Sequence, residues 1–346
     1  MPFREGEQLD PRALAPRLEG KLPGAHGVPE VWQFGGGKAN LTYLVRYGEH
    51  EYVLRRPPHG PVAPGSHDMA REFRVLSVLH RGFPPAPRAL LYCDDASVIG
   101  APFFVMERRH GIVVRETVPP EFGGGADAEA NRKLSEVLID TLVDFHRVDP
   151  ASVGLETLGR PEGFLGRQVK GWQERWERAK TREIPVATEV SRWLGDHLPP
   201  SPPATLVHND WRLDNMMVAF DDPGRVVAVF DWDMCTLGDP LADLGSLLSM
   251  WLEAGEDVPL VAPMPSRERG FMTRAEAIRR YGERSGRDVS RMPYYAVFGI
   301  FKMAVIVQQI YFRWQRGQTK DQRFAALDAV VEGMMHMAEA RLRELG

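Results

Sequence analysis

The sequence predicts an α+β protein with two lobes, a small N-terminal lobe of strands around one helix and a larger, mainly helical lobe. Three observations support this prediction. The chain has 346 residues, which is enough for two lobes of ordinary size. Strand, strand, helix and strand patterns fill about the first 105 residues, and beyond Gly111 the patterns are mostly helical. We therefore expect one domain over 1–105 and a second over 106–346.

The N-terminal lobe begins with glycines that precede an alternating apolar run over 41–45, which predicts a strand. HEYVLRRPP predicts a second strand, and the two can form a hairpin around Gly48. SHDMAREFRVLSVLHRG predicts a helix that begins at Ser66 or Asp68 and ends at Gly82. SVIGAPFFVMERRHG predicts a further strand that continues into a polar connector between the lobes.

The second lobe contains a series of helical patterns and two short strand-like stretches. The predicted helices cover 131–147, 166–182, 186–197, 240–254, 273–284, 293–315 and 320–344. The strand-like stretches cover 215–220 and 225–232, and the turn sequence DDPG joins them. A polar loop should therefore lead into a small hairpin.

Composition and charge favour a soluble globular protein. Hydrophobic residues make up 43% and charged residues 26% of the chain, and the net charge of -4 gives no support to binding of nucleic acid or a membrane. The most apolar stretch, 294–312, is interrupted by Lys302 and two glutamines, which favours a buried helix over a membrane helix. Cys93 and Cys235 lack metal-ligand spacing, and the N-terminus is too polar for a signal peptide, so we expect a cytoplasmic location.

The stretch HNDWRLDNMMV, with the hairpin after it, gathers oxygen-bearing side chains. Asp210 and Asn215 are five positions apart, and Asp231 ends the second hairpin strand. Because a hairpin brings its two ends together, Asn215 and Asp231 should approach each other and the loop with Asp210. Such ligands suit Mg²⁺, which proteins usually hold with one or two carboxylates together with substrate phosphates. Asp210 is placed to orient or deprotonate an alcohol.

This set resembles the protein-kinase catalytic set, in which a loop Asp precedes a metal-binding Asn by five residues. LVHNDWRLDNMMV and VVAVFDWDMCTLGDPLADLG are more similar to the aminoglycoside phosphotransferase and choline kinase-like family, and the resemblance runs from the glycine loop near 35 to the helices near 310. It implies a protein-kinase-like fold with an antiparallel sheet in the small lobe. It also implies ATP or GTP with Mg²⁺, and transfer of the γ-phosphoryl group to a hydroxyl of a small molecule.

The resemblance assigns roles to individual residues. It makes Asp210 the base-like catalytic residue and His208 the residue that holds the catalytic loop in shape. Asn215 and Asp231 become the magnesium ligands.

Neighbouring acidic residues have more than one interpretation. Asp233 either touches the metal or solvates the end of the strand, and Asp214 is expected to be an exposed loop residue. Asp239 precedes a proline and is typical of a helix N-cap. Asp243, one turn later, either has a structural role in its helix or braces the catalytic loop.

The glycine stretch FGGGKANLTYLV satisfies neither the Walker A spacing nor the full glycine pattern of protein kinases. Its backbone amides could still approach phosphates. The resemblance places the nucleotide loop here, at Gly36, Gly37, Lys38 and Asn40.

The lysine that protein kinases carry on the next strand is missing. Arg55 occupies the matching position, with Arg56 as an alternative one residue later, and Glu72 on the following helix is the expected partner. Arginine still supplies a permanent cation and a bidentate fork for phosphate. In the connector between the lobes, the resemblance makes Met106, Glu107 and Arg108 the hinge residues that face adenine.

The stretch from 166 to 183 is the expected acceptor-facing segment, with six basic and three acidic residues. One interpretation is an acceptor site that suits a phosphate, carboxylate or nucleotide-like group. Its candidate residues are Arg167, Lys170, Trp172 and Trp176. The other is an amphipathic helix with a solvated basic side and two tryptophans in the core.

Two functional hypotheses follow. The first is a small-molecule kinase, because no long loop after FDWD could order a peptide. Its acceptor is expected to be anionic or neutral rather than an aminoglycoside, because a polycation calls for a carboxylate-rich pocket and the segment 166–183 is mainly basic. The chain is most similar to the branch whose kinase-like domain is fused to acyl-CoA dehydrogenases, which suggests a hydroxyacyl-CoA. The alternative is a nucleotide-binding pseudokinase or regulatory module, which the missing lysine favours and the intact Asp210, Asn215 and Asp231 oppose.

Overall fold

The computed structural model describes residues 3–4, 6–35, 40–58, 68–256, 264–319 and 321–344. The chain divides into two compact units. The first consists of Met1–His110, Ala151–Leu155 and Val227–Cys235; the second consists of Gly111–Pro150, Glu156–Val226 and Thr236–Gly346. The division predicted from the sequence, at residue 105, takes no account of the two later segments that join the first unit.

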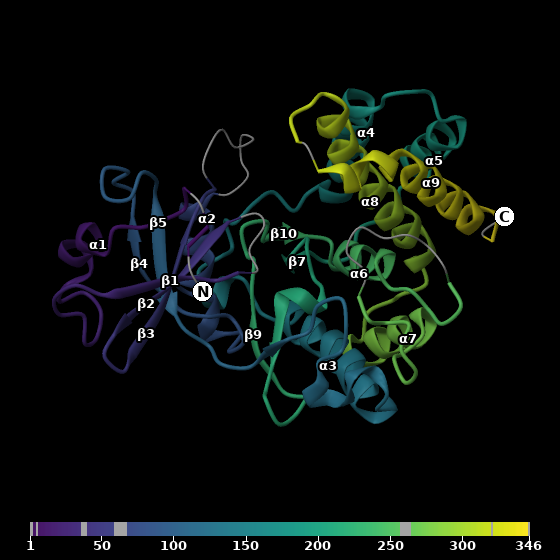
Figure 1. Cartoon of the computed structure of the whole chain (residues 1–346). Helices are drawn as coiled ribbons and strands as arrows, with labels where there is room; N and C mark the ends of the chain where they lie inside the picture. The colour runs from purple at the N-terminus through teal and green to yellow at the C-terminus, as the bar shows by residue number, and fades with distance from the viewer. Residues whose placement is uncertain are drawn as a thin grey trace. The chain divides into compact units, whose positions relative to one another are not determined.

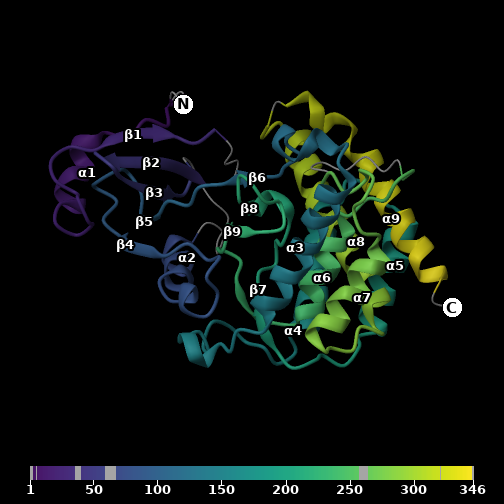
Figure 2. The same ribbon diagram turned by 90° about the horizontal axis from the view of Figure 1, so that it is seen from below.

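The first unit is built on an antiparallel sheet (Figure 1), whose strands follow the order β1-β2-β3-β5-β4 (Figure 2). Its strands are β1 Glu30–Gln33, β2 Leu41–Tyr47, β3 His50–Arg56, β4 Ala89–Cys93 and β5 Phe103–Glu107. Its helices are α1 Pro11–Leu18 and α2 Met69–Leu76, with short 3-10 helices η1 Leu79–Arg81 and η3 Ala151–Val153. Alternate residues of β2, including Tyr43 and Val45, are fully buried, as the alternating pattern predicts. The predicted hairpin joins β2 to β3, and Gly48 has a φ of 57° in its turn.

Several elements of this unit differ from the prediction. The helix begins after Asp68, whose side chain accepts a hydrogen bond from the Arg71 amide, but it ends at Leu76 rather than Gly82. Val78 has a φ of -128°, outside the helical range, and the chain continues as η1. The helix α1 and the strands β1 and β4 were not predicted. α1 contains two prolines, and β4 has an irregular register against β5, so neither has a clear periodic pattern.

The second unit is mainly helical. Its α-helices are α3 Ala128–His146, α4 Phe164–Ala179, α5 Pro185–Asp196, α6 Pro240–Ser249, α7 Arg274–Ser285, α8 Met292–Gln315 and α9 Leu327–Arg343. Short 3-10 helices are η2 Pro120–Gly125, η4 Leu213–Asn215 and η5 Gln322–Ala326. The prediction of one last helix over 320–344 was wrong at its start, because Asp321 caps the separate turn η5. Likewise, α6 ends five residues earlier than 254.

The apolar helix α8 lies in the core of this unit. By length and composition alone it is able to cross a membrane, but 56% of its most apolar window is buried inside the protein. It packs against α4, α6 and α9 (Figure 2). These contacts fit a core helix of a helical unit, as the polar interruptions in its sequence indicate.

Short strands position the polar loop of this unit. The strand β7 Thr205–Val207 pairs with β10 Thr236–Gly238, and β6 Ile112–Val113 pairs with β8 Met216–Val218. The loop 208–215 connects β7 to β8. After β8, a hydrogen bond from the Ala219 amide to the Arg225 carbonyl closes the predicted turn, and β9 Val226–Val229 follows. The folded chain is thus the predicted α+β protein, with an antiparallel sheet in its first unit and helices in most of its second.

Candidate active site

The loop between β7 and β8 is anchored on α3 by one tryptophan. We call residues 208–215 the Asp210 loop. Trp211 is 1% exposed, and its indole Nε1 donates a hydrogen bond of 3.0 Å to the Leu138 carbonyl. Its ring is nearly parallel to that of Phe145, with the ring centres 5.8 Å apart. An aromatic side chain with a satisfied polar atom gives a rigid attachment, so the residue next to Asp210 is held in place.

Asp243 on α6 holds the start of the Asp210 loop. Its two carboxylate oxygens accept hydrogen bonds from the backbone amides of His208 and Asn209, both at 2.6 Å. The side chain is completely buried, and the His146 ring lies 3.3 Å from it. Burial by itself would raise the pKa of the Asp243 carboxyl, but hydrogen bonds and charge from His146 and His208 bring that pKa below its usual value. The carboxylate therefore braces the loop.

Within the loop, Asp210 and Asn215 are in direct contact. The Asn215 amide nitrogen donates to the backbone oxygen of Asp210 at 2.8 Å and to its Oδ2 at 2.9 Å. This leaves Oδ1 of Asn215 as the atom able to bind a cation. His208 is completely buried, and its Nδ1 accepts a hydrogen bond of 3.3 Å from the Asp210 amide. The buried side chain of His208 thus supports the backbone of the loop at Asp210.

Asp214 lies in the same loop and is half-buried, with an ion pair to Arg212. The expectation of an exposed Asp214 was wrong because the neighbouring guanidinium folds back over its carboxylate. Asp239, by contrast, is the predicted N-cap of α6, and its side chain accepts from the Leu241 amide at 3.0 Å.

The first unit contains a cluster centred on Arg55. Nε of Arg55 lies 3.3 Å from Glu72 Oε2 on α2, and Nη2 donates to Asp231 Oδ1 at 2.8 Å. Arg55 is therefore the arginine that pairs with Glu72. Arg56 instead donates to the Ile99 carbonyl at 2.5 Å, which excludes the alternative register.

Asp231 reaches this cluster because its chain segment packs on the first unit. The Val229 amide donates to the Pro85 carbonyl at 2.9 Å, and the rings of Phe83 and Trp232 meet edge to face with centres 5.9 Å apart. Asp231 itself has a φ of 67°, in the left-handed region that non-glycine residues seldom occupy. Such backbone conformations often occur at functional sites, where the surrounding packing stabilises them.

The cluster holds more negative than positive charge. Burial alone would lower the pKa of the Arg55 guanidinium, yet the carboxylates of Glu72 and Asp231 raise it overall. The pKa of Glu72 is raised to about 8, first because the side chain is buried and further because Asp231 and Asp233 are close. One guanidinium therefore faces three acidic side chains.

This charge balance fits a bound cation. In the part of the chain that the structure describes, no group of three or more His, Cys, Asp and Glu side chains forms a metal site by itself. Magnesium does not need such a group, since it commonly takes one or two carboxylates and completes its shell with water and phosphate oxygens. Asp231 belongs to the first unit and Asn215 to the second. Their joint binding of Mg²⁺ stays a prediction.

The structure describes only some of the residues that were predicted to bind the nucleotide. Gly36, Gly37 and Lys38 lie outside the described residues, and Asn40 is buried at the start of β2.

The predicted hinge residues end β5 and follow it. Met106 is buried, and Glu107 accepts a hydrogen bond from the Arg88 amide at 2.9 Å. Arg108 pairs with Glu51 at 2.6 Å, and its guanidinium lies 5.9 Å from the centre of the Phe34 ring. These contacts fix the end of β5, and a contact with adenine stays a prediction.

The predicted acceptor residues on α4 have different environments. Trp172 and Trp176 are buried, whereas Lys170 is exposed. Arg167 is also exposed, and it donates to the backbone carbonyls of Arg160 and Glu162. The two tryptophans therefore belong to the core, as the amphipathic-helix interpretation expects.

Sequence reasoning missed two cations beside Trp172. The Arg175 guanidinium lies 4.6 Å from the centre of its ring, and Nζ of Lys302 on α8 lies 5.9 Å from it. Lys302 also donates to the Asn209 carbonyl at 2.9 Å, so Trp172, in the middle of α4, lies near the Asp210 loop. One signal was available in the sequence: Lys302 is the cation that interrupts the apolar pattern of α8.

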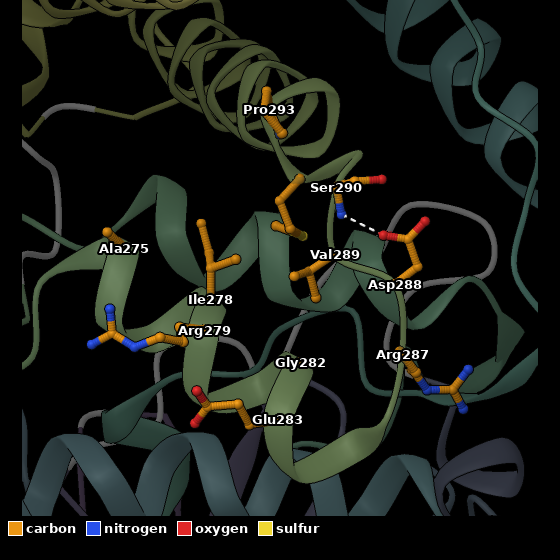
Figure 3. Close-up of a pocket in the computed structure, with 11 residues that line it drawn as sticks. Ala275, Ile278, Arg279, Gly282, Glu283, Arg287, Asp288, Val289, Ser290 and Pro293 are labelled. Carbon is orange, nitrogen blue, oxygen red and sulfur yellow. Dashed lines mark hydrogen bonds between the residues drawn. The ribbon is translucent and has the colours of Figure 1, made fainter.

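A separate surface hollow of about 710 Å³ lies between α7 and the start of α8 (Figure 3). Arg279, Glu283 and Arg287 line it together with apolar residues such as Ile278 and Val289. It contains none of the site residues predicted from the sequence, and the chemistry described above lies elsewhere in the chain.

Comparison with known proteins identifies the family. Residues 30–280 match the family model described as the phosphotransferase enzyme family. Acyl-CoA dehydrogenase family member 10 of Mus musculus is 32% identical over 97% of this chain, and member 11 of Gallus gallus is 37% identical over 70% of it. The chain covers 31% of the length of each of these two relatives.

Solved structures share the fold. A protein of Ralstonia eutropha JMP134 that is provisionally classed as an aminoglycoside phosphotransferase is 27% identical, with a TM-score of 0.83 over 97% of this chain and 99% of the other. A type I macrolide 2'-phosphotransferase shares the fold at 20% identity, with a TM-score of 0.59 over 92% of this chain and 95% of the other. The predicted kinase-like fold class is confirmed. The chain belongs to the phosphotransferase enzyme family.

Proposed function

We propose that this protein transfers the γ-phosphoryl group of ATP, bound with Mg²⁺, to a hydroxyl of an anionic or neutral small molecule. The observation that carries the proposal is the fixed position of Asp210, which Asn215 contacts directly within a loop braced by Asp243. A carboxylate held in this way can orient an alcohol and accept its proton. Phosphoryl transfer depends mostly on positioning and charge neutralisation, so further catalytic groups are not required.

Each half of the site then has its own task. Arg55 supplies a permanent cation for phosphate oxygens, and Glu72 holds that arginine on β3. Asp231 and Asn215 would hold Mg²⁺, which supplies neutralisation of phosphate charge when it is bound. A thermostable mutant of an aminoglycoside phosphotransferase with the same fold is solved as a ternary complex with AMP-PNP and hygromycin B, which supports a nucleotide as donor and a small molecule as acceptor.

The charges near Asp210 favour an acceptor that is not a polycation. Lys302 and Arg175 both lie beside the Trp172 ring, and the Lys302 ammonium contacts the residue before Asp210. Positive charge at this position would repel the ammonium groups of an aminoglycoside and would attract carboxylate or phosphate groups. The similarity to acyl-CoA dehydrogenase family members 10 and 11 adds a specific candidate, a hydroxyacyl-CoA.

A second candidate function is a nucleotide-binding regulatory module without catalysis. Arg55 in place of the usual lysine is the observation in its favour. The contact between Asp210 and Asn215 opposes it, because a module without catalysis has no need to hold a carboxylate in a fixed loop.

A phosphoryl-transfer screen tests the proposal. The protein is incubated with radiolabelled ATP and Mg²⁺, and hydroxyacyl-CoA esters and hydroxy acids are compared with sugars, choline and aminoglycosides. We expect label to be transferred to one or more of the first group at the highest kcat/KM. Efficient phosphorylation of kanamycin would overturn the choice of acceptor, and nucleotide binding without transfer or hydrolysis would favour the regulatory module.

A further inference from the structure

Lys302 is a buried cation in the middle of the most apolar helix of the protein. The residue is 8% exposed. Its Nζ donates a hydrogen bond of 2.9 Å to the Asn209 carbonyl and one of 3.2 Å to Oγ of Ser246 on α6. Burying an ammonium group is costly unless it is well paired, so a lysine at this core position requires a reason that packing alone does not give.

The partner of Lys302 is an unusual piece of backbone. Asn209 has a φ of 67°, in the left-handed region. Its carbonyl belongs to the peptide group that it shares with Asp210. Lys302 binds the oxygen of this peptide group, and Nδ1 of His208 accepts from its N–H at 3.3 Å. Both ends of the peptide group are thereby held, and its orientation decides where the Asp210 side chain points.

The surroundings of Lys302 support a fixed position. The indole ring of Trp172 lies 5.9 Å from the ammonium nitrogen, and aromatic faces attract cations at this distance. Burial lowers the pKa of the Lys302 amino group, whereas the Asp243 and Asp210 carboxylates act to raise it. Lys302 is therefore surrounded by the components of the loop and of the helix that braces it.

We infer that Lys302 is a positioning residue for phosphoryl transfer, which acts through its hydrogen bond to the Asn209 carbonyl and sets the orientation of Asp210. This inference rests on the proposed function, in which Asp210 orients the acceptor hydroxyl. It adds a residue from α8 to the set on α6 and in the loop itself.

Three substitutions separate the hydrogen bond from the charge. Lys302→Met keeps the length of the side chain and removes both, Lys302→Gln keeps an N–H donor without the charge, and Lys302→Arg keeps both. Lys133→Met is the matched control, because Lys133 is an exposed lysine on α3 that pairs with Glu129. Turnover is normalised to the number of nucleotide-binding sites found by calorimetry, so that a smaller folded fraction does not count as lost catalysis.

We expect Lys302→Met to lower kcat by about 100-fold, since misplacing a catalytic group by about 1 Å has an effect of this size. The Kd for the nucleotide should stay within about threefold, because Lys302 does not touch the nucleotide in this assignment. Lys302→Gln and Lys302→Arg should restore most of the turnover. Hydrogen exchange of amides 208–215 should be faster in the Met variant and normal in the Gln variant.

Several results would overturn the inference. One is unchanged kcat and loop exchange in Lys302→Met, and another is a Gln variant as slow as the Met variant. Loss of cooperative unfolding in Lys302→Met would assign the residue to folding instead. Absence of transfer by the wild-type protein to every acceptor would reject the proposed function, whereas the hydrogen-exchange comparison would still decide the role of Lys302 in the loop.

Discussion

The two units each contain a buried cluster of charges, and the two clusters are built differently. In the first unit, one guanidinium, that of Arg55, faces the acidic side chains of Glu72, Asp231 and Asp233. In the second unit, the Asp243 carboxylate accepts hydrogen bonds from two backbone amides and lies 3.3 Å from the His146 ring. The first cluster has excess negative charge, whereas both carboxylate oxygens in the second already accept hydrogen bonds.

This difference separates a site that receives a ligand from one that keeps a shape. A cluster with unbalanced charge gains when a cation enters, and the side chain of Asp231 is 29% exposed. The Asp243 cluster has neither the exposure nor the excess charge for that role. Its contacts instead fix the backbone that presents Asp210. Substitutions in the two clusters should therefore have different effects on ligand binding, turnover and stability.

The largest effect should come from Asp210, the residue that the second cluster presents. Asp210→Asn keeps the shape of the side chain and removes its ability to accept a proton. We expect kcat to fall by about 1,000-fold, or about 4 kcal/mol of transition-state stabilisation, as for other general bases. Nucleotide affinity should change by less than about threefold. Steady-state kinetics and calorimetry measure the two quantities, and wild-type turnover in the variant would remove Asp210 from the mechanism.

Removing the cation of the first cluster should affect stability and nucleotide binding together. Arg55→Met leaves Glu72 and Asp231 without their partner, and breaking a buried pair in this way costs about 3 kcal/mol of the free energy of unfolding. Urea titration without nucleotide measures this loss. Adding Mg²⁺ should restore part of the lost free energy of unfolding, because the metal ion can replace the charge of the Arg55 guanidinium.

Arg55→Lys is the control for Arg55→Met. It keeps the charge but loses the fork that reaches two carboxylates. Its free energy of unfolding and its affinity for the nucleotide should therefore both lie between those of the wild type and those of the Met variant. A Met variant that is as stable as the wild type would show that the cluster does not need its cation.

Sequence reasoning names residues more readily than contacts. Asp210 and Asn215 were named because their spacing matches a family pattern, and residue spacing can be read directly from the sequence, whereas Asp243 was left between a structural role in its helix and a brace of the loop. Spacing did not reveal that Arg55 donates to Asp231, since these residues are far apart in the chain and meet through the packing of the segment Val227–Cys235.

Secondary-structure elements also differ in how well the sequence predicts them. Helices with a strong 3.6-residue period, such as α3 and α8, were predicted within a few residues of their bounds. The strand β4 is a short apolar run with an irregular register, so its pairing with β5 depends on the rest of the sheet. Lys302 was noted as an interruption of an apolar helix, but its role depends on the backbone carbonyl that it reaches.

Weakening the brace of the Asp210 loop should have a smaller effect than removing Arg55. Asp243→Asn replaces one carboxylate oxygen by an amide group, which then faces a backbone N–H of His208 or Asn209. A buried donor without an acceptor costs about 2 kcal/mol. We expect this loss in urea unfolding, with a decrease in kcat and little change in nucleotide affinity. Asp144→Asn, on an exposed side chain of α3, should change none of the three quantities. A loss of nucleotide affinity greater than the loss of turnover would contradict the assigned role.

The smallest effect concerns the pH dependence that the second cluster gives to stability. His146 is buried between Asp243 and Tyr281, whose hydroxyl lies 2.8 Å from its Nδ1, and burial lowers the pKa of its imidazole below the ordinary value of 6.5. The unfolded chain therefore binds a proton at a higher pH than the folded protein does. It follows that the contribution of His146 to the free energy of unfolding is at its full value above about pH 6.5 and decreases as the pH falls from there toward the folded pKa.

The lowered pKa of the Asp243 carboxyl adds its own loss of stability only below about pH 4, the range in which unfolded aspartate takes up its proton. Urea unfolding at several pH values between about 5 and 7.5 therefore avoids the Asp243 range. Glu72, whose pKa is raised to about 8, also titrates in this window and lowers the unfolding free energy as the pH rises, so the difference in slope between the wild type and His146→Gln is what reports the imidazole. His146→Gln should flatten the slope of unfolding free energy against pH in this window, even though the variant is less stable overall. His26→Gln, at an exposed position, is the matched control and should keep the wild-type slope. If the slope in His146→Gln equals that of the wild type, other histidines are responsible for it, and His146 serves the Asp243 cluster through packing and hydrogen bonding alone.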